Sequence, residues 1–126
     1  MHRAHLGTVL LFALAAAGWA SIDQSTSDKR TYEADVAPIV GKFCNPCHLA
    51  ESENPSGLHL DSYETMIAGG EKGTPIVAGK PDKSIFYLKL LADPPFGKQM
   101  PRGKKKLTKE EIQVIREWIE QGALKK

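Results

Sequence analysis

Beyond the first thirty residues, apolar side chains recur along the chain at spacings of three and four. The first such run consists of Val36, Ile39, Val40 and Phe43. This spacing places them on one face and predicts an amphipathic helix. Pro38 lies inside the run and has no backbone N–H. The regular helix is therefore expected to begin close to Pro38 or to kink there.

Residues 62–68 predict a second, short helix. Asp61 is expected to cap its N-terminus, with Glu64, three residues later, as the reciprocal partner of a capping box. Gly69 and Gly70 are expected to end it, because glycine readily adopts the backbone conformation that follows a helix.

A further amphipathic helix is predicted from Pro81, which suits a first helical position, to a point before Asp93. Its apolar positions are Ile85, Phe86, Leu88 and Leu91. The stretch 96–106, FGKQMPRGKKK, combines glycine, proline and a run of positive charges. That composition predicts a loop.

The last helix has the clearest sequence signals. Thr108 and Glu111 can form a capping box, Leu107 and Ile112 a hydrophobic staple, and Gly122 can stop the helix. One face carries Ile112, Ile115, Trp118 and Ile119. No segment alternates in the manner of a strand, so the sequence predicts an all-α fold of three to four helices. The loops between them are long and need something rigid to pack against.

Composition adds two constraints. The chain has 126 residues, enough for one domain, and 17 Lys and Arg against 15 Asp and Glu, so no global charge argues for nucleic acid. Aromatic residues make up only 7%. A core built from these side chains alone would be thin, and a large apolar cofactor would help to fill it.

The N-terminus has the pattern of a secretory signal. Arg3 precedes a mostly apolar run over residues 6–17, and small residues at Gly18 and Ala20 suit a cleavage site. The interpretation is a signal peptide over residues 1–20, a flexible leader over 21–31 and one domain over 32–126. The alternative is an uncleaved membrane anchor, although the run is short for a membrane span. Export would place the protein in the periplasm or another extracytoplasmic, oxidising compartment.

The only two cysteines lie three residues apart in FCNPCH, as Cys44 and Cys47, with His48 directly behind. Three kinds of site compete. A thioredoxin-like dithiol needs its first cysteine at a helix N-terminus after a buried strand, whereas a helix is predicted here. A zinc site needs four ligands, and His59 would have to serve as a distant fourth.

The third kind of site is a covalently attached haem, because Cys-x-x-Cys-His is the attachment signature of c-type haem. The two thiols can add across the two vinyl groups on one edge of the porphyrin. The following His48 is then carried beneath the ring, where its imidazole reaches the iron. The export signal and the absence of other cysteines favour this interpretation over the dithiol and the zinc site.

An electron-transfer haem usually has a second axial ligand, often methionine. Met100 lies in the basic loop before Pro101, where an apolar side chain has little role unless it turns inward. We therefore predict Met100 as the distal ligand. Met66 has the spacing of a core residue in the helix over 62–68. His59 is the alternative for a bis-histidine site, and a loop position without ligand function is the simpler interpretation of it.

At this point the sequence resembles the class I cytochrome c family, and more closely the Planctomycete-type cytochrome c domain. The similar stretches are YEADVAPIVGKFCNPCH, SGLHLDSYETMIAGGEKGTPIVAGKPDKSIFYLKL and MPRGKKKLTKEEIQVIREWIEQGA, between Tyr32 and Ala123. Lys80 departs from the acidic helix cap expected in that family. The resemblance implies an all-α cytochrome c-like fold wrapped around one haem c, held by Cys44 and Cys47 and ligated by His48 and Met100.

These residues together predict an exported, monomeric monohaem cytochrome that transfers single electrons between redox partners. With both axial positions filled it has no open site for a substrate, so it is not expected to be an enzyme. The alternative is a haem-based sensor or ligand-binding protein in which Met100 leaves the iron. Six cations surround Met100, which suggests docking of an acidic partner, although a solvated loop explains them too. They are Lys98, Arg102, Lys104, Lys105, Lys106 and Lys109.

Overall fold

The computed structural model of the protein describes residues 29–126. The predictions of a signal peptide and of most of the leader concern residues 1–28 and lie outside the described residues. Arg30 and Thr31 already make contacts with the folded unit, because the Arg30 amide donates to Gln121 Oε1 at 2.6 Å. Thr31 caps the first helical segment.

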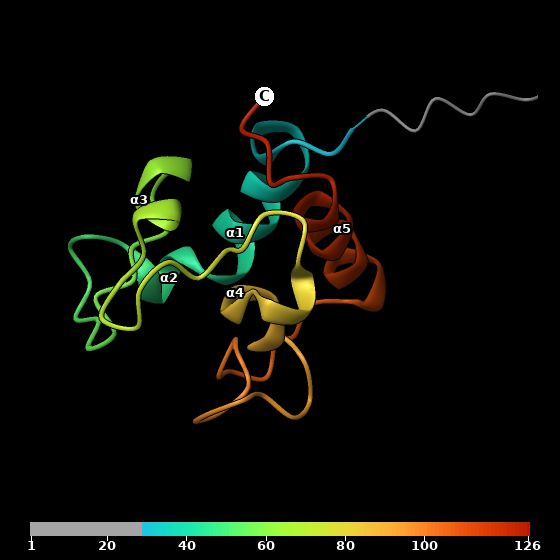
Figure 1. Ribbon diagram of the computed structural model, residues 1–126. Coiled ribbons are helices and arrows are strands. Elements are labelled where there is room, and N and C mark those ends of the chain that lie inside the picture. Colours follow the sequence, from blue (N-terminus) through green and yellow to red (C-terminus); the bar gives the residue numbers. More distant parts are fainter. Residues whose placement is uncertain (1–28) are drawn as a thin grey trace, which may run out of the picture.

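Helices and long loops make up the described part of the chain (Figure 1). In chain order they are η1 (Tyr32–Val36), α1 (Ala37–Phe43), α2 (Asn45–His48), α3 (Tyr63–Ala68), η2 (Pro81–Lys83), α4 (Ile85–Leu88) and α5 (Lys109–Glu120). The predicted all-α class is confirmed: residues 29–126 form no sheet, and α2 and α4 are single turns. One isolated bridge pairs Gly70 with Gly73.

The first predicted helix forms as two joined pieces. The π-helix η1 runs directly into α1, and Pro38 is the second residue of α1. At that position proline costs little, because the first amides of a helix have no intrahelical acceptor. The regular α-helix therefore begins beside Pro38, as predicted.

Ser62, not Asp61, caps helix α3. Its hydroxyl accepts from the Thr65 amide at 3.2 Å, and the Thr65 hydroxyl accepts from the Ser62 amide at 3.0 Å. Asp61 instead accepts from the amide of Ala50 in the preceding loop, at 3.1 Å. The capping box thus lies one residue later than the sequence predicts, and the helix ends before Gly69 as predicted.

The helix predicted from Pro81 is interrupted at Ser84. Its first turn is the 3₁₀ segment η2, and α4 follows after the break. The Ser84 hydroxyl is fully buried, accepts from the Val77 amide at 2.9 Å and donates to the Lys80 carbonyl at 2.9 Å. These bonds hold the extended backbone at Ser84 against the preceding loop. The helical periodicity of the sequence contains no sign of this break.

The core is built around α5. Ile115, Trp118 and Ile119 are buried, and α5 packs against η1, η2 and α4. The ring of Tyr32 lies 6.0 Å from the ring of Trp118, between centroids. The capping box of Thr108 and Glu111 forms as predicted. In Figure 1, α5 and α3 lie on opposite sides of α1.

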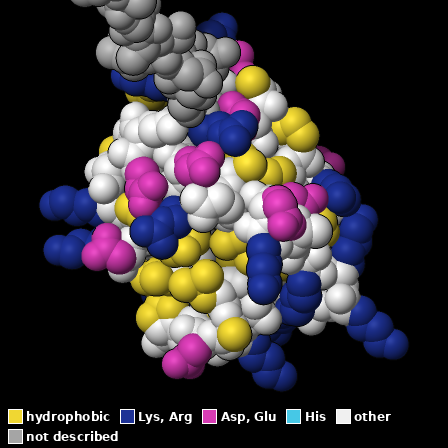
Figure 2. All heavy atoms as spheres, turned by 90° about the vertical axis from the view of Figure 1, so that its right-hand side faces the viewer, with side chains coloured by type: hydrophobic (Ala, Val, Ile, Leu, Met, Phe, Trp, Pro, Cys, Tyr) yellow, Lys and Arg dark blue, Asp and Glu magenta, His cyan; other side chains and the backbone are white. Residues whose placement is uncertain are grey.

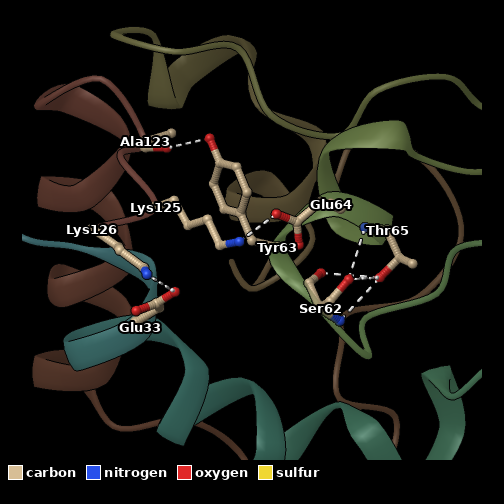
Figure 3. A network of polar contacts seen from close by, with 8 residues as sticks. All are labelled: Glu33, Ser62, Tyr63, Glu64, Thr65, Ala123, Lys125 and Lys126. Carbon is tan, nitrogen blue, oxygen red and sulfur yellow. Dashed lines mark hydrogen bonds and ion pairs between the residues drawn. The ribbon is translucent and has the colours of Figure 1, made fainter.

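The C-terminal segment returns to α3 and η1 (Figure 3). The Tyr63 hydroxyl donates to the Ala123 carbonyl at 3.0 Å, and Lys125 pairs with Glu64 at 2.5 Å. The amide of Tyr32 donates to the carbonyl of Leu124 at 2.8 Å. The segment that follows α5 therefore joins η1 to α3.

Gly70 lets two loops come into direct backbone contact, and Gly69 lets the turn after α3 close on itself. A Cβ atom at Gly70 would collide with the backbone of Ser56, and one at Gly69 would collide with that of Gly73. The Glu71 amide also donates to the Ser56 carbonyl at 2.9 Å. The loop over residues 51–57 is thus seated on the turn that follows α3.

Candidate functional site

A cavity of about 770 Å³ opens between α2, α4 and the loops around residues 53–58, 70–75 and 96–105. Its volume lies in the usual range of about 300–1,000 Å³ for cofactor sites. All four predicted site residues line it: Cys44, Cys47, His48 and Met100. Apolar side chains complete the wall, among them Phe43, Leu58, Leu60, Phe86 and Leu90. A smaller hollow of about 440 Å³ beside Arg30 contains none of the predicted site residues.

Cys44 and Cys47 lie one helical turn apart at the junction of α1 and α2. The Cys44 amide closes α1 on the Val40 carbonyl, and the Cys44 carbonyl accepts from the Cys47 amide at 3.1 Å. Both thiols are free; Cys44 is half-buried and Cys47 exposed. Burial, and to a lesser degree the neighbouring Cys47, raises the pKa of Cys44 to about 11. A dithiol oxidoreductase needs the opposite shift of its reactive cysteine, so this environment argues against that chemistry.

His48 is held by a backbone carbonyl. Its Nδ1 atom lies 2.9 Å from the carbonyl oxygen of Leu58, and the His48 carbonyl accepts from the Leu60 amide at 2.7 Å. A carbonyl oxygen only accepts, so at this distance Nδ1 carries the proton and donates. In the neutral imidazole the free lone pair is then on Nε2. This is the arrangement in which histidine ligates a metal through Nε2.

Met100 is positioned by the end of α4. Its amide donates to the Lys89 carbonyl at 2.7 Å, and the Gln99 side chain donates to the Leu90 carbonyl at 2.8 Å. On the other side, Lys106 donates to the Pro101 carbonyl. The loop has no regular secondary structure, yet these contacts bring Met100 to the same cavity as His48.

Met66 and His59 lie elsewhere. Met66 is completely buried in the core, as the sequence predicts, and is not part of the cavity wall. His59 is half-buried outside the wall, and its Nδ1 has no hydrogen-bond partner among the described residues. Within residues 29–126 no three His, Cys, Asp or Glu side chains converge on a point that could hold a metal ion. A zinc site that uses His59 therefore has no support.

The rim of the cavity is mainly basic. Six cations and two carboxylates line it: Lys42, Lys72, Lys89, Lys98, Arg102, Lys105, Glu53 and Glu71. Lys42 and Lys105 approach the ring of Phe43, at 4.7 and 5.3 Å from its centroid. Figure 2 shows one face of the molecule, where apolar side chains gather in the lower half with lysine and arginine side chains around them.

Comparison with known proteins decides between the classes considered above. Residues 44–102 match the sequence profile of the family described as Planctomycete cytochrome C. These residues therefore have the sequence profile of a cytochrome c domain of this family. Haem binding and electron transfer in general follow for the domain, with the two cysteines and His48 as the haem motif. Domains of this type are usually extracytoplasmic.

One solved structure resembles the domain. It is "Kuenenia stuttgartiensis Hydrazine Synthase", at 25% sequence identity and a TM-score of 0.48. The match covers 74% of this chain but only 16% of that chain. No curated protein matches the sequence significantly. Within residues 29–126, no helix is both long and apolar enough to cross a membrane.

The sequence analysis missed the part of the site that lies in the loop over residues 51–57. Asn54 lines the cavity, and its side chain contacts both Leu58 and His48. The available signal was the run Asn54-Pro55-Ser56-Gly57, which is typical of a β-turn. Turn composition predicts a loop, but it does not show which carbonyl the loop will present to the histidine.

Proposed function

We propose that the protein is an exported monohaem cytochrome c that carries single electrons between redox partners. One observation supports this most strongly: the four residues predicted to bind haem, from two separate parts of the chain, line one largely apolar cavity of about 770 Å³. The two thiols one turn apart, a free imidazole nitrogen and a thioether are together the donor set of a c-type haem. The residues present therefore fit this group.

In this proposal the two cysteines anchor the cofactor. Each thiol would hold the haem through a thioether, with sulfur on one vinyl carbon and the thiol hydrogen on the other, so that attachment would need no oxidant or reductant. Their separation by one helical turn lets Cys44 and Cys47 reach two points along one edge of a porphyrin. Covalent attachment keeps the cofactor from being lost outside the cell.

His48 and Met100 are the proposed axial ligands. The Nε2 lone pair of His48 is free because Nδ1–H is bonded to the Leu58 carbonyl. The Met100 sulfur would supply a second ligand from its loop beyond α4. When bound, haem supplies a one-electron couple at its iron. With both positions filled there is no open coordination site for substrate, and we assign no enzymatic activity.

The remaining side chains tune and present the site. Apolar walls such as Leu60, Phe86 and Leu90 exclude water, which with methionine ligation favours a higher reduction potential than a bis-histidine site. The basic rim would attract an acidic patch on a partner toward the cavity mouth. The redox partners of this chain are expected to bear such patches.

Denaturation followed by extraction with acidified acetone tests the proposal. If Cys44 and Cys47 form thioethers, the haem stays with the protein, and a redox titration of the native protein follows a one-electron curve. In Cys44→Ala/Cys47→Ala the haem should be extractable or absent. Haem that moves into the solvent from the wild-type protein would contradict covalent attachment and, with it, this function.

A further inference from the structure

Asn54 and His48 converge on the same carbonyl oxygen. The Asn54 side-chain amide donates to the Leu58 carbonyl at 2.5 Å, and His48 Nδ1 lies 2.9 Å from that oxygen. The two nitrogens are 3.3 Å apart. Since Nδ1–H must donate to the carbonyl, both nitrogens are donors here and share one acceptor.

The orientation of the Asn54 amide is fixed from its other end. Its Oδ1 atom accepts from the Ser56 hydroxyl at 2.7 Å and from the Ser56 amide at 3.3 Å. The Gly57 amide donates to the Asn54 carbonyl at 3.0 Å and closes the turn. A backbone N–H requires an acceptor, so the oxygen of the side-chain amide faces Ser56 and its NH₂ group faces Leu58.

We propose that Asn54 is a positioning residue that tunes the electron donation of His48 through their shared acceptor. A hydrogen bond from the far nitrogen of a metal-bound histidine orients the ring and raises its basicity. A carbonyl oxygen that accepts from two donors forms a weaker hydrogen bond with each of them. Asn54 therefore holds the Leu58 carbonyl in place while it limits how strongly that oxygen polarises the imidazole. The inference rests on the proposed function in one respect, since it takes His48 as an iron ligand.

A purely structural role for Asn54 makes a different prediction. If it only builds the turn, a substitution that keeps Oδ1 toward Ser56 should leave the iron site unchanged. Asn54→Asp keeps that acceptor and replaces the NH₂ group by a second carboxylate oxygen beside Nδ1. A charged acceptor forms hydrogen bonds roughly twice as strong as a neutral one. The imidazole then becomes more electron-rich, which favours the oxidised iron.

The experiment compares three variants of the haem-loaded protein. Asn54→Asp is the test. Lys72→Gln is its matched control, because it changes the charge at the cavity by the same one unit, whereas the polar contacts of the His48 ring are with Leu58 and Asn54. Asn54→Leu removes both the NH₂ donor and the Oδ1 acceptor of the side chain. The measurements are the reduction potential and the solvent-exchange rate of His48 Nδ1–H by NMR. The second measurement does not depend on which residue occupies the opposite axial position.

We expect Asn54→Asp to lower the reduction potential more than Lys72→Gln does, and to slow Nδ1–H exchange. Asn54→Leu leaves the Leu58 carbonyl to His48 alone, so it should also slow exchange, by about 2- to 10-fold, the equivalent of roughly one hydrogen bond. Equal potentials for Asn54→Asp and Lys72→Gln, or wild-type exchange in both Asn54 variants, would overturn the inference. Acidified-acetone extraction of the same wild-type sample separates this from a failure of the proposed function, because only the latter releases the haem.

Discussion

The backbone amide of Met100 donates a 2.7 Å hydrogen bond to the carbonyl oxygen of Lys89. Lys89 also donates from its side chain to the Phe96 carbonyl at 2.5 Å, and Gln99 bonds to the Leu90 carbonyl. The last carbonyls of a helix have no intrahelical partner, so they are available to a following segment. The end of α4 therefore holds the loop that carries the proposed distal ligand.

The first prediction concerns that ligand. Met100→Ala should abolish the weak far-red band of methionine-to-iron charge transfer and let the reduced protein bind carbon monoxide. Met66→Leu is the control, since it conserves core volume and should cost less than about 1.5 kcal/mol. Wild-type protein that already binds carbon monoxide readily would favour the sensor alternative. Absence of the band in the wild type as well would contradict ligation by Met100.

The second prediction concerns the hydrogen bond by which the side chain of Gln99 holds the loop to the end of α4. Gln99→Leu removes the bond to the Leu90 carbonyl and should destabilise the closed loop by about 1 kcal/mol, or roughly 5-fold in the open population. The rate at which carbon monoxide binds to the reduced protein, measured by flash photolysis, should rise by a similar factor. Gln113→Leu on the exposed face of α5 is the matched control. Equal rates for the two variants would show that Gln99 does not restrain Met100.

The third prediction concerns partner docking. Of the six cations predicted around Met100, only Lys98, Arg102 and Lys105 line the cavity. Reversal of these three charges should reduce the second-order rate of electron exchange with an acidic partner and flatten its salt dependence. Electrostatic steering raises such rates by about 10- to 1000-fold, and screening removes most of it near 1 M salt, where the Debye length is about 3 Å.

The control for docking is a variant with the same change of net charge, made at three positions that do not line the cavity. Lys80, Lys83 and Lys126 are exposed and do not line it, so their reversal to glutamate alters net charge equally. If both triple variants show the same salt slope, only net charge matters. The basic loop would then be an ordinary solvated surface.

The fourth prediction concerns the closure of the C-terminus on α3. Tyr63→Phe removes the 3.0 Å hydrogen bond to the Ala123 carbonyl and should cost about 1 kcal/mol of unfolding free energy. For a domain of this size that lowers Tm by roughly 4–8 °C. Lys125→Gln breaks only the exposed pair with Glu64 and should cost less, about 0–1 kcal/mol. Thermal unfolding followed by circular dichroism measures both.

The fifth prediction concerns acid stability. The Thr31 amide, 2.8 Å from Asp35, lowers the pKa of that carboxyl below its ordinary value of 3.8, and Arg30 adds to the effect. A carboxyl with a lowered pKa in the folded state stabilises the fold above its ordinary pKa. This contribution is lost as the pH falls through 3.8 and then through the folded value.

Urea denaturation at a series of pH values tests this expectation. Asp35→Asn should be less stable than the wild type at neutral pH, and the difference should shrink in acid. Asp82→Asn, at an exposed position in η2, is the control. A stability difference between Asp35→Asn and the wild type that persists undiminished at low pH would contradict the assignment.

The parts of the structure that the sequence predicts correctly are those with local causes. Cys44, Cys47 and His48 lie within five consecutive residues, so one helical turn is enough to bring them together. The capping box at Thr108 and the termination before Gly69 likewise depend on neighbours three or four residues away. Met100 also lines the cavity, where the carbonyls of Lys89 and Leu90 just beyond α4 hold its loop, and its role as an iron ligand stays a prediction.

The features that the sequence analysis missed depend on contacts between distant segments. Asp61 is a good helix cap by composition, but it bonds instead to Ala50, eleven residues earlier. The break at Ser84 depends on the loop carbonyls and amides that its buried hydroxyl meets. The role of Asn54 requires knowing that the Leu58 carbonyl faces His48. No periodicity or turn signal specifies such pairings, because they arise from packing.

The contact between the loop over residues 51–57 and the turn after α3 limits how this chain can diverge. Gly69 and Gly70 admit no side chain, whereas an added methyl group at Gly41 or Gly103 meets open space. Descendants of this sequence should therefore exchange Gly41 freely and retain the glycine pair, whereas the space beside Gly103 belongs to the cavity. The loop that carries Asn54 can thus keep its position only in sequences that retain these two glycines, although neither glycine has a side chain to contribute to the site.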